Sequence, residues 1–210
     1  MKKMIPLLLL AALALAACEK EPDRGELDYK FMVYTDYDTG HDFSTAHTYY
    51  LPDSILLIGN YPTAQYWKDS YAQRIIGTYA DNMESLGYTR TDKRESADLG
   101  LQVSYVENTY HAIVGGSPEW WWNYSGYWNL GYWGNWGHWY YPYVVHYSFS
   151  TGAFIAEMLD LKAPQGEDEQ LPVVWSSYMT GQLSGSQAFD VQQTIDGVNQ
   201  SFDQSAYLAH

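Results

Sequence analysis

Several short segments of this chain alternate hydrophobic with polar positions, as β-strands do when they bury one face. In the clearest of them, 99–105, the alternation predicts that Leu99 and Leu101 point inward while Gln102 and Ser104 point outward. A further run at 110–114 would extend this strand past a bend. The segments with a strand pattern are 31–37, 46–51, 55–58, 99–105, 143–150, 153–161 and 171–183.

Two other segments repeat their apolar positions every three or four residues, which is the period of an amphipathic helix. The first lies within 63–86, with Pro62 where a helix can begin and Gly87 where one can end. The second covers roughly 188–205. The apolar stripe of the first helix would consist of Trp67, Tyr71, Ile75, Tyr79 and Met83, which we interpret as core residues.

The order of these elements favours an α+β fold over a doubly wound parallel sheet, because strands and helices do not alternate along the chain. We expect an antiparallel or mixed β-sheet with the two amphipathic helices packed on one face and the other face partly open. The turn at Thr151-Gly152 would join 143–150 to 153–161 as a hairpin. Residues 30–207 would form this single domain.

The N-terminus has the pattern of an export signal. Lys2 and Lys3 precede an apolar run that is too short to span a bilayer stably, so residues 1–17 are predicted to be a signal peptide. Leu15-Ala16-Ala17-Cys18 resembles the bacterial lipobox, which predicts cleavage before Cys18 and acylation of this cysteine. Residues 18–29 would then be the lipidated cysteine and a flexible tether. An ordinary secretory signal is the alternative.

This pattern predicts a protein held by lipid in the outer membrane, on either the periplasmic or the surface-exposed side. Glu19, Lys20, Glu21 and Asp23 follow the cysteine. Acidic residues at this place resemble the surface-export signal of lipoproteins in some Gram-negative groups, but they are equally consistent with a solvated tether. The side of the membrane therefore stays open.

Charge and cysteine content exclude several classes of function. The formal net charge of −14 would become −16 once Lys2 and Lys3 leave with the signal, which disfavours nucleic acid as a partner. Cys18 is the one cysteine, so intramolecular disulfides and cysteine-ligated zinc or iron–sulfur sites are excluded. The histidines lack metal-binding spacings, and no nucleophile or phosphate-loop motif is present, so we expect no metal, no cofactor and no catalytic residue.

The stretch 120–143 is the most unusual part of the chain. Thirteen of its 24 residues are Trp or Tyr, and none is Asp, Glu, Lys or Arg. Within an insert at 118–143, three interpretations stay open: rings packed on the sheet, a surface that contacts a protein or membrane, and a platform for glycans. The candidate binding residues are Trp120, Trp121, Trp122, Trp128, Trp133, Trp136 and Trp139.

Short motifs along residues 30–207 resemble a known family of bacterial lipoproteins, domain of unknown function 4136. A Gly- and aromatic-rich insert between central strands is part of the likeness. The chain departs from the pattern after Trp175, where Ser176, Ser177 and Tyr178 stand in place of an expected Arg and Gly. The motifs that carry the resemblance are Tyr37-Asp38, Asp42-Phe43-Ser44, Thr48-Tyr49, Leu86-Gly87-Tyr88, Ala97-Asp98-Leu99, Asp160 and Val174-Trp175.

The resemblance implies an envelope lipoprotein with an α+β fold, and the family supplies no activity or catalytic residue to carry over. We therefore expect a non-enzymatic interaction or assembly module, anchored through Cys18, with the tryptophans of the insert as its contact surface. The alternative is an envelope glycan-binding protein or a glycan hydrolase that uses two carboxylates as acid and base. The predicted partners are the membrane and an envelope protein or glycan.

Overall fold

The structure, a computed structural model, describes residues 32–59, 61, 63–107, 138–144, 152–164, 170–181 and 186–209. The chain divides into two units, Met1–Lys30 and Phe31–His210, and all described residues belong to the second. The predicted signal peptide, the tether and most of the insert at 118–143 lie outside the described residues.

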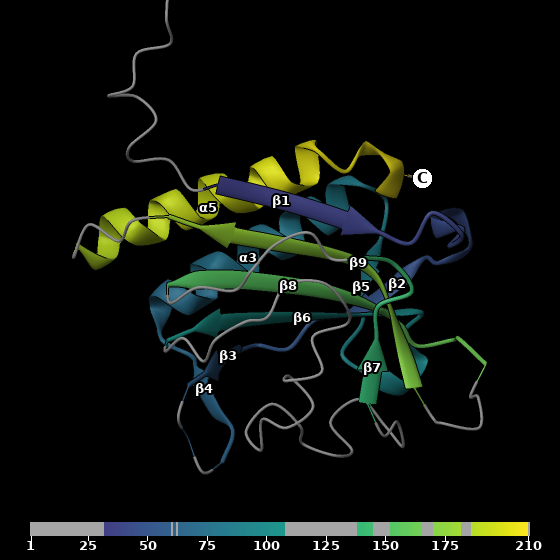
Figure 1. Ribbon diagram of the computed structural model, residues 1–210, viewed down its shortest axis with the longest axis horizontal. Helices are drawn as coiled ribbons and strands as arrows, with labels where there is room; N and C mark the ends of the chain where they lie inside the picture. Colours follow the sequence, from purple (N-terminus) through teal and green to yellow (C-terminus); the bar gives the residue numbers. More distant parts are fainter. Residues whose placement is uncertain are drawn as a thin grey trace, which may run out of the picture. The chain divides into compact units, whose positions relative to one another are not determined.

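The described residues form a mixed β-sheet with two α-helices (Figure 1). Along the main path of the sheet the strand order is β1-β9-β8-β6-β2-β5. In addition, β3 pairs with β6 and β4, and β7 pairs with β9. The strands are β1 (Met32–Tyr37), β2 (Thr48–Tyr50), β3 (Ile55–Ile58), β4 (Gln65–Trp67), β5 (Thr89–Arg90), β6 (Leu99–Val106), β7 (His138–Tyr140), β8 (Ala153–Asp160) and β9 (Gln170–Thr180).

The sheet is mixed, and β6 has an antiparallel neighbour on one side and parallel neighbours on the other. β9 pairs antiparallel with β1 and β8, and β8 pairs antiparallel with β6. β2 and β3 run parallel to β6 and share one edge of it, β2 opposite Leu99 and β3 opposite Ser104 to Val106. Each of them pairs with one further strand on its other side, β2 with β5 in parallel and β3 with β4 in antiparallel orientation.

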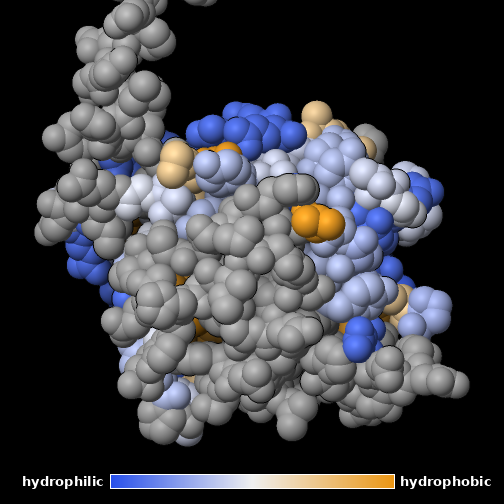
Figure 2. All heavy atoms as spheres, in the orientation of Figure 1, coloured by the Kyte–Doolittle hydropathy of each residue, from blue (hydrophilic) through white to orange (hydrophobic). Residues whose placement is uncertain are grey.

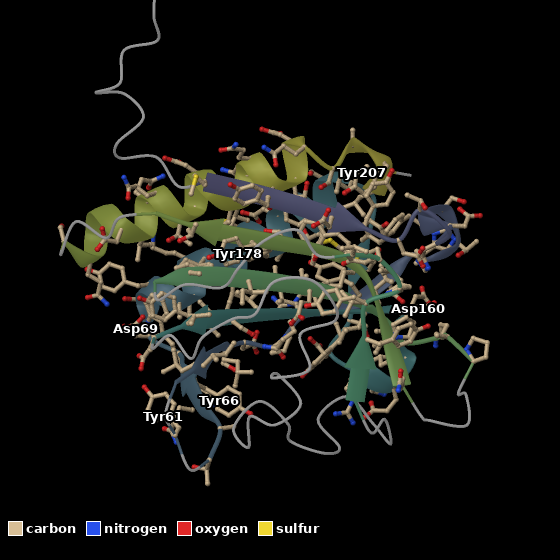
Figure 3. All side chains as sticks on the ribbon, viewed as in Figure 1. Tyr61, Tyr66, Asp69, Asp160, Tyr178 and Tyr207 are labelled. Atoms are coloured by element: carbon tan, nitrogen blue, oxygen red, sulfur yellow. The ribbon has the colours of Figure 1, made fainter. Side chains whose placement is uncertain are left out.

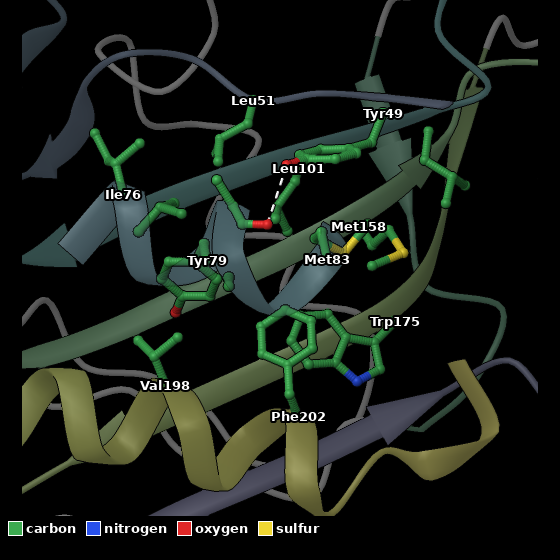
Figure 4. Close-up of a cluster of buried hydrophobic side chains, with 14 of the residues drawn as sticks. Tyr49, Leu51, Ile76, Tyr79, Met83, Leu101, Met158, Trp175, Val198 and Phe202 are labelled. Atoms are coloured by element: carbon green, nitrogen blue, oxygen red, sulfur yellow. Dashed lines mark hydrogen bonds between the residues drawn. The ribbon is translucent and has the colours of Figure 1, made fainter. Parts of the chain in front are cut away.

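The two helices are α3 (Ser70–Ser85) and α5 (Gln187–Asp203). They contact each other and cover the same face of the sheet, where their apolar residues join a continuous core. Figure 4 shows Trp175 of β9 beside Phe202 of α5, with ring centroids 5.4 Å apart. Nearby, the hydroxyl of Tyr49 donates to the carbonyl of Ala80 at 3.3 Å. The α+β class, the mixed sheet and the helices on one face are confirmed.

The opposite face of the sheet differs from the prediction. Its side chains form a second buried cluster that includes Ile155, Tyr178 and Tyr141. Gln102 and Ser104, predicted to point outward into solvent, lie on this face and are buried. The prediction of a partly open face was therefore wrong for these strands. Period-two alternation identifies the two faces of a strand, but it cannot tell whether the polar face meets solvent or other residues.

The first predicted helix begins later than its apolar period indicates. Residues 65–67 form β4, and α3 starts at Ser70. Asp69 has extended backbone angles, and its carboxylate accepts hydrogen bonds from the N–H groups of Tyr71 and Ala72, which is the geometry of an N-cap. The helix ends at Ser85 with Leu86 as its C-cap, and the predicted stop Gly87 follows with a φ of 100°, a conformation that glycine adopts readily.

The remaining predicted elements agree with the structure to within two or three residues where they can be compared. Segment 55–58 matches β3, 153–161 corresponds to β8, and 188–205 corresponds to α5. Of the predicted strand at 143–150, only residues 143 and 144 are described, and neither is in a strand; 110–114 lies outside the described residues. No helix within the described ranges is long and apolar enough to cross a membrane.

Candidate functional site

The predicted binding tryptophans fall almost entirely where the structure gives no description. Cys18 and the six tryptophans from Trp120 to Trp136 lie outside the described residues. Trp139 lies in the described strand β7, which runs parallel to β9 with Trp139 opposite Leu171. The tryptophan surface and the lipidation of Cys18 stay predictions.

Another part of the molecule forms a cavity of about 570 Å³, which we term the aromatic cavity. Small-molecule sites in proteins have volumes in this range, about 300–1,000 Å³. The cavity lies where the β3–β4 hairpin, the end of β6, the start of β8, the N-cap of α3 and the first turns of α5 meet. Its lining residues are Leu57, Tyr66, Trp67, Lys68, Asp69, Tyr105, Glu107, Phe154, Gln187, Asp190, Val191 and Thr194.

One wall of the aromatic cavity is a cluster of three rings from three strands. The ring centroids of Tyr105 and Phe154 are 4.8 Å apart, and the centroid of Trp67 lies 6.2 Å from Tyr105 and 6.3 Å from Phe154. These distances are typical of favourable aromatic pairs. Phe154 is buried, whereas Tyr66, which precedes Trp67 in β4, is 37% exposed. The wall is thus fixed at its base and open to solvent at its rim.

The polar lining of the aromatic cavity is acidic. Asp69, Glu107 and Asp190 contribute carboxylates, and Lys68 contributes an ammonium group. Asp69 caps α3 through the N–H groups of Tyr71 and Ala72 at 2.9 and 3.0 Å. Figure 3 labels Tyr66 and Asp69, which both line the cavity.

Glu107 is also held by a partner, because it accepts a hydrogen bond from the hydroxyl of Tyr61. In α5, the hydroxyl of Thr194 donates to the backbone carbonyl of Asp190 at 2.8 Å, which fixes the first turns of this helix beside the cavity. The carboxylates of Asp69 and Glu107 thus have structural roles in addition to lining the cavity.

The charged groups beside Tyr105 in the aromatic cavity are negative. Burial raises the pKa of Tyr105, and the negative charges of Glu107 and Asp190 raise it further because they oppose a phenolate. At the rim, the ammonium nitrogen of Lys68 lies 5.5 Å from the ring centroid of Tyr66, within the range of a cation–π contact. The cavity therefore combines ring faces with an excess of negative charge.

The sequence interpretation missed this cavity because it placed Trp67 in the helical stripe of 63–86. The signal that could have corrected it is Asp69-Ser70, since aspartate is among the preferred N-cap residues and would begin the helix after Trp67. Glu107, Phe154 and Asp190 come from segments far apart in the chain. Nothing in the spacing of these residues indicates that they meet.

A second group of buried polar side chains lies on the sheet face opposite the helices. Glu157 in β8 is fully buried, and one of its carboxyl oxygens accepts a hydrogen bond from the hydroxyl of Tyr141. Next to it, Tyr143 donates to the hydroxyl of Ser176 at 2.9 Å. These bonds satisfy polar groups inside the second cluster, which is a structural role.

Neither region has the composition of a metal centre. In the part of the chain that the structure describes, no group of three or more His, Cys, Asp or Glu side chains could hold a metal ion.

The surface of the same part is mostly hydrophilic in the view of Figure 2, with a few scattered hydrophobic side chains. The large hydrophobic residues exposed among the described residues are Met32, Tyr34, Tyr66 and Val144.

Comparison with known proteins gives a family and a fold. A family model described as "Domain of unknown function (DUF4136)" matches residues 33–205. The crystal structure of a DUF4136 family protein from Bacteroides thetaiotaomicron VPI-5482 is similar, with 50% sequence identity and a TM-score of 0.78. The similarity covers 87% of this chain and 99% of that chain. No curated protein matches.

Proposed function

This chain belongs to the DUF4136 family, and from that premise we propose that it is a lipid-anchored, non-enzymatic binding module of the cell envelope. The observation that carries the binding role is the aromatic cavity, which is large enough for a small ligand and is walled by Trp67, Tyr105 and Phe154. A site with mostly apolar walls and a few polar groups is the usual form of a ligand pocket.

The anchor is supported by the sequence Leu15-Ala16-Ala17-Cys18 and by the absence of any other cysteine. Each buried CH₂ of an acyl chain contributes about 0.8 kcal/mol, so two or more chains hold a protein stably at a membrane. A protein attached in this way needs no membrane-spanning helix. The proposed location is the outer membrane, on the periplasmic or the surface-exposed side.

The Cys18→Ser variant tests the anchor. We expect the wild-type chain to sediment with membranes and to carry the added mass of acyl chains, while Cys18→Ser loses that mass and its signal stays uncleaved. A matched control is Ser54→Cys, which adds a cysteine elsewhere and should leave both cleavage and acylation at Cys18 unchanged. Processing of Cys18→Ser at residue 17 without acylation would instead identify an ordinary secretory signal.

Binding is favoured over catalysis because Asp69 and Glu107 accept hydrogen bonds from α3 and Tyr61, which position them as structural groups. The neutral probe 2-phenylethanol, followed by ligand-observed NMR with the full chain in micelles, tests whether the cavity admits a ligand. We expect binding above that of protein-free micelles. Leu57→Trp should abolish this binding because the larger side chain fills the cavity.

The matched control for the cavity-filling variant is Tyr34→Trp, which places the same side chain on the exposed edge strand β1. We expect it to bind 2-phenylethanol as the wild type does. If Leu57→Trp and Tyr34→Trp bind the probe equally, the cavity is not the binding site and the proposal loses its main support.

The glycan alternative is favoured by one observation, which is that carboxylates and aromatic rings line the same cavity. Aromatic faces stack on sugar rings, and two carboxylates can supply acid and base catalysis. Incubation of the chain with isolated envelope glycan, with assay of new reducing ends, separates the two functions. A binding module releases none, whereas a hydrolase releases reducing ends that Glu107→Gln or Asp190→Asn abolishes.

We further propose that the tryptophans of the insert at 118–143 form a second contact surface, for an envelope protein or glycan. The basis is the concentration there of seven of the nine tryptophans, a residue type enriched at interfaces. Iodide quenching of tryptophan fluorescence tests this surface. Strong quenching is expected for an exposed surface, and protected, blue-shifted emission would make these rings part of a core instead.

A further inference from the structure

We propose that the aromatic cavity binds a small organic ammonium ion, whose apolar body lies against Trp67, Tyr105 and Phe154 and whose positive charge faces Glu107 and Asp190. This inference rests on the proposed binding function and names the chemical class of its ligand. It concerns described residues only and is independent of the insert at 118–143.

The ring faces supply the first part of the argument. A cation over the face of Trp or Tyr is attracted by the ring quadrupole, more strongly where water is partly excluded. The protein already contains one such contact at this place, since the Lys68 ammonium lies over the Tyr66 ring at 5.5 Å. The rim of the cavity therefore accommodates an alkylammonium group, and the cluster of rings deeper in the cavity offers the same kind of attraction to a ligand ammonium beside it.

The charge of the lining supplies the second part. Three carboxylates, those of Asp69, Glu107 and Asp190, stand against the single ammonium of Lys68. The raised pKa of Tyr105 has burial as its main cause and the charges of Glu107 and Asp190 as its next, which agrees with an excess of negative charge beside this phenol. A cationic ligand would neutralise this excess, whereas an anionic ligand would add to it.

The helix N-termini beside the cavity do not reverse this preference. The first turn of a helix attracts anions through its unsatisfied N–H groups. In α3, however, the N–H groups of Tyr71 and Ala72 already bond to Asp69. In α5, Asp190 stands in the first turn and places its own negative charge there. Both positive helix ends are thus balanced by carboxylates of the chain.

Three probes of nearly equal size and different charge test the inference: 2-phenylethylammonium, neutral 2-phenylethanol and phenylacetate. Their affinities for the full chain in neutral micelles would be measured by isothermal titration calorimetry at pH 7. We expect the ammonium ion to bind about tenfold tighter than the alcohol, given the strength of cation–π and partly screened charge contacts, and phenylacetate to bind weakest.

Charge variants then locate the effect. Glu107→Gln and Asp190→Asn should each weaken ammonium binding severalfold and weaken alcohol binding much less, so the ratio of the two affinities falls. Lys68→Met removes a competing positive charge, so it should tighten ammonium binding; this residue is exposed, and its replacement should not disturb folding. Asp81→Asn, an exposed carboxylate in the middle of α3 and not among the cavity residues, is the matched control and should change neither affinity.

The outcomes separate this inference from the binding function on which it rests. Equal affinity for the ammonium and the alcohol, or tightest binding of phenylacetate, overturns the charge preference while the cavity stays a ligand site. Weaker ammonium binding by Lys68→Met also contradicts it. If none of the three probes binds in a manner that Leu57→Trp abolishes, both the inference and the proposed binding function fail.

Discussion

A single carboxyl oxygen of Asp98 accepts hydrogen bonds from both the N–H group and the hydroxyl of Thr48, at 2.9 and 2.8 Å. The same oxygen accepts the N–H group of His47 at 2.9 Å. Asp98 precedes β6 and Thr48 begins β2, so these bonds fix the start of two parallel neighbours. Two of the motifs that carry the family resemblance, at Thr48 and Asp98, therefore meet in space and have a structural role.

Replacing Asp98 with alanine should destabilise the protein by about 1.5–3 kcal/mol at neutral pH, because hydrogen bonds to charged groups contribute about that much. Burial alone would raise the pKa of Asp98, but the hydrogen bonds from His47 and Thr48 outweigh it and lower this pKa below its usual value. The stabilisation is therefore present above the unfolded-state pKa of about 3.9 and is lost as pH falls through the lower folded-state pKa.

Urea unfolding at several pH values checks this expectation. The stability difference between wild type and Asp98→Ala should be largest at neutral pH and should shrink in acid. Asp92→Ala, which removes an exposed loop carboxylate, should stay within about 0.5 kcal/mol of wild type throughout. A difference for Asp98→Ala that is constant down to strong acid would show that its hydrogen bonds are not the source of the effect.

The indole N–H of Trp175 donates to the hydroxyl of Ser205 at 2.9 Å, and both residues are fully buried. This bond ties β9 to the segment after α5. Ser205→Ala would leave a buried donor unsatisfied, which costs about 1–3 kcal/mol. Thermal unfolding measures this loss. Ser85→Ala removes an exposed hydroxyl that bonds to the carbonyl of Asn82, and it should change stability by less than about 0.5 kcal/mol.

Two neighbouring tyrosines on the other sheet face allow a matched pair of substitutions. Tyr141→Phe removes one donor to the buried carboxyl group of Glu157 and should cost about 1–3 kcal/mol. Tyr143→Phe removes a bond to the neutral hydroxyl of Ser176 and should cost about 0.5–1.5 kcal/mol. Chemical denaturation ranks the two variants. The reverse ranking would mean that Glu157 does not depend on Tyr141.

The sequence predicts those parts of the fold that depend on local pattern. The apolar run at 55–58 forms β3, because a short apolar run is itself a signal for a buried strand. Gly87 stops α3, because glycine readily adopts the positive φ found there. The burial of the Gln102 and Ser104 side chains is not encoded in this way. Their burial depends on what packs against the second face of the sheet, and that is a tertiary property.

The candidate site shows the same limit more strongly. Trp67 fits the helical period of the residues after it, and only the cap at Asp69 separates strand from helix. Trp67, Glu107 and Asp190 lie about 40 and 80 residues apart in the chain and meet only because the sheet and both helices converge. Composition can therefore indicate that aromatic and acidic residues are available, but not that they share a cavity.

Asp69 has two roles, as the N-cap of α3 and as an acidic group of the aromatic cavity, and two substitutions separate them. Asp69→Ala removes both, so it should cost about 0.5–2 kcal/mol of stability and weaken 2-phenylethylammonium binding. Asp69→Ser keeps a good capping residue but removes the charge. Its stability should stay close to that of wild type, while its affinity for the ammonium ion should fall as in Asp69→Ala. Thermal unfolding and calorimetric titration of both variants measure the two effects. If Asp69→Ser retained full ammonium affinity, the carboxylate of Asp69 would act in folding alone, and Glu107 and Asp190 would supply the negative field of the cavity.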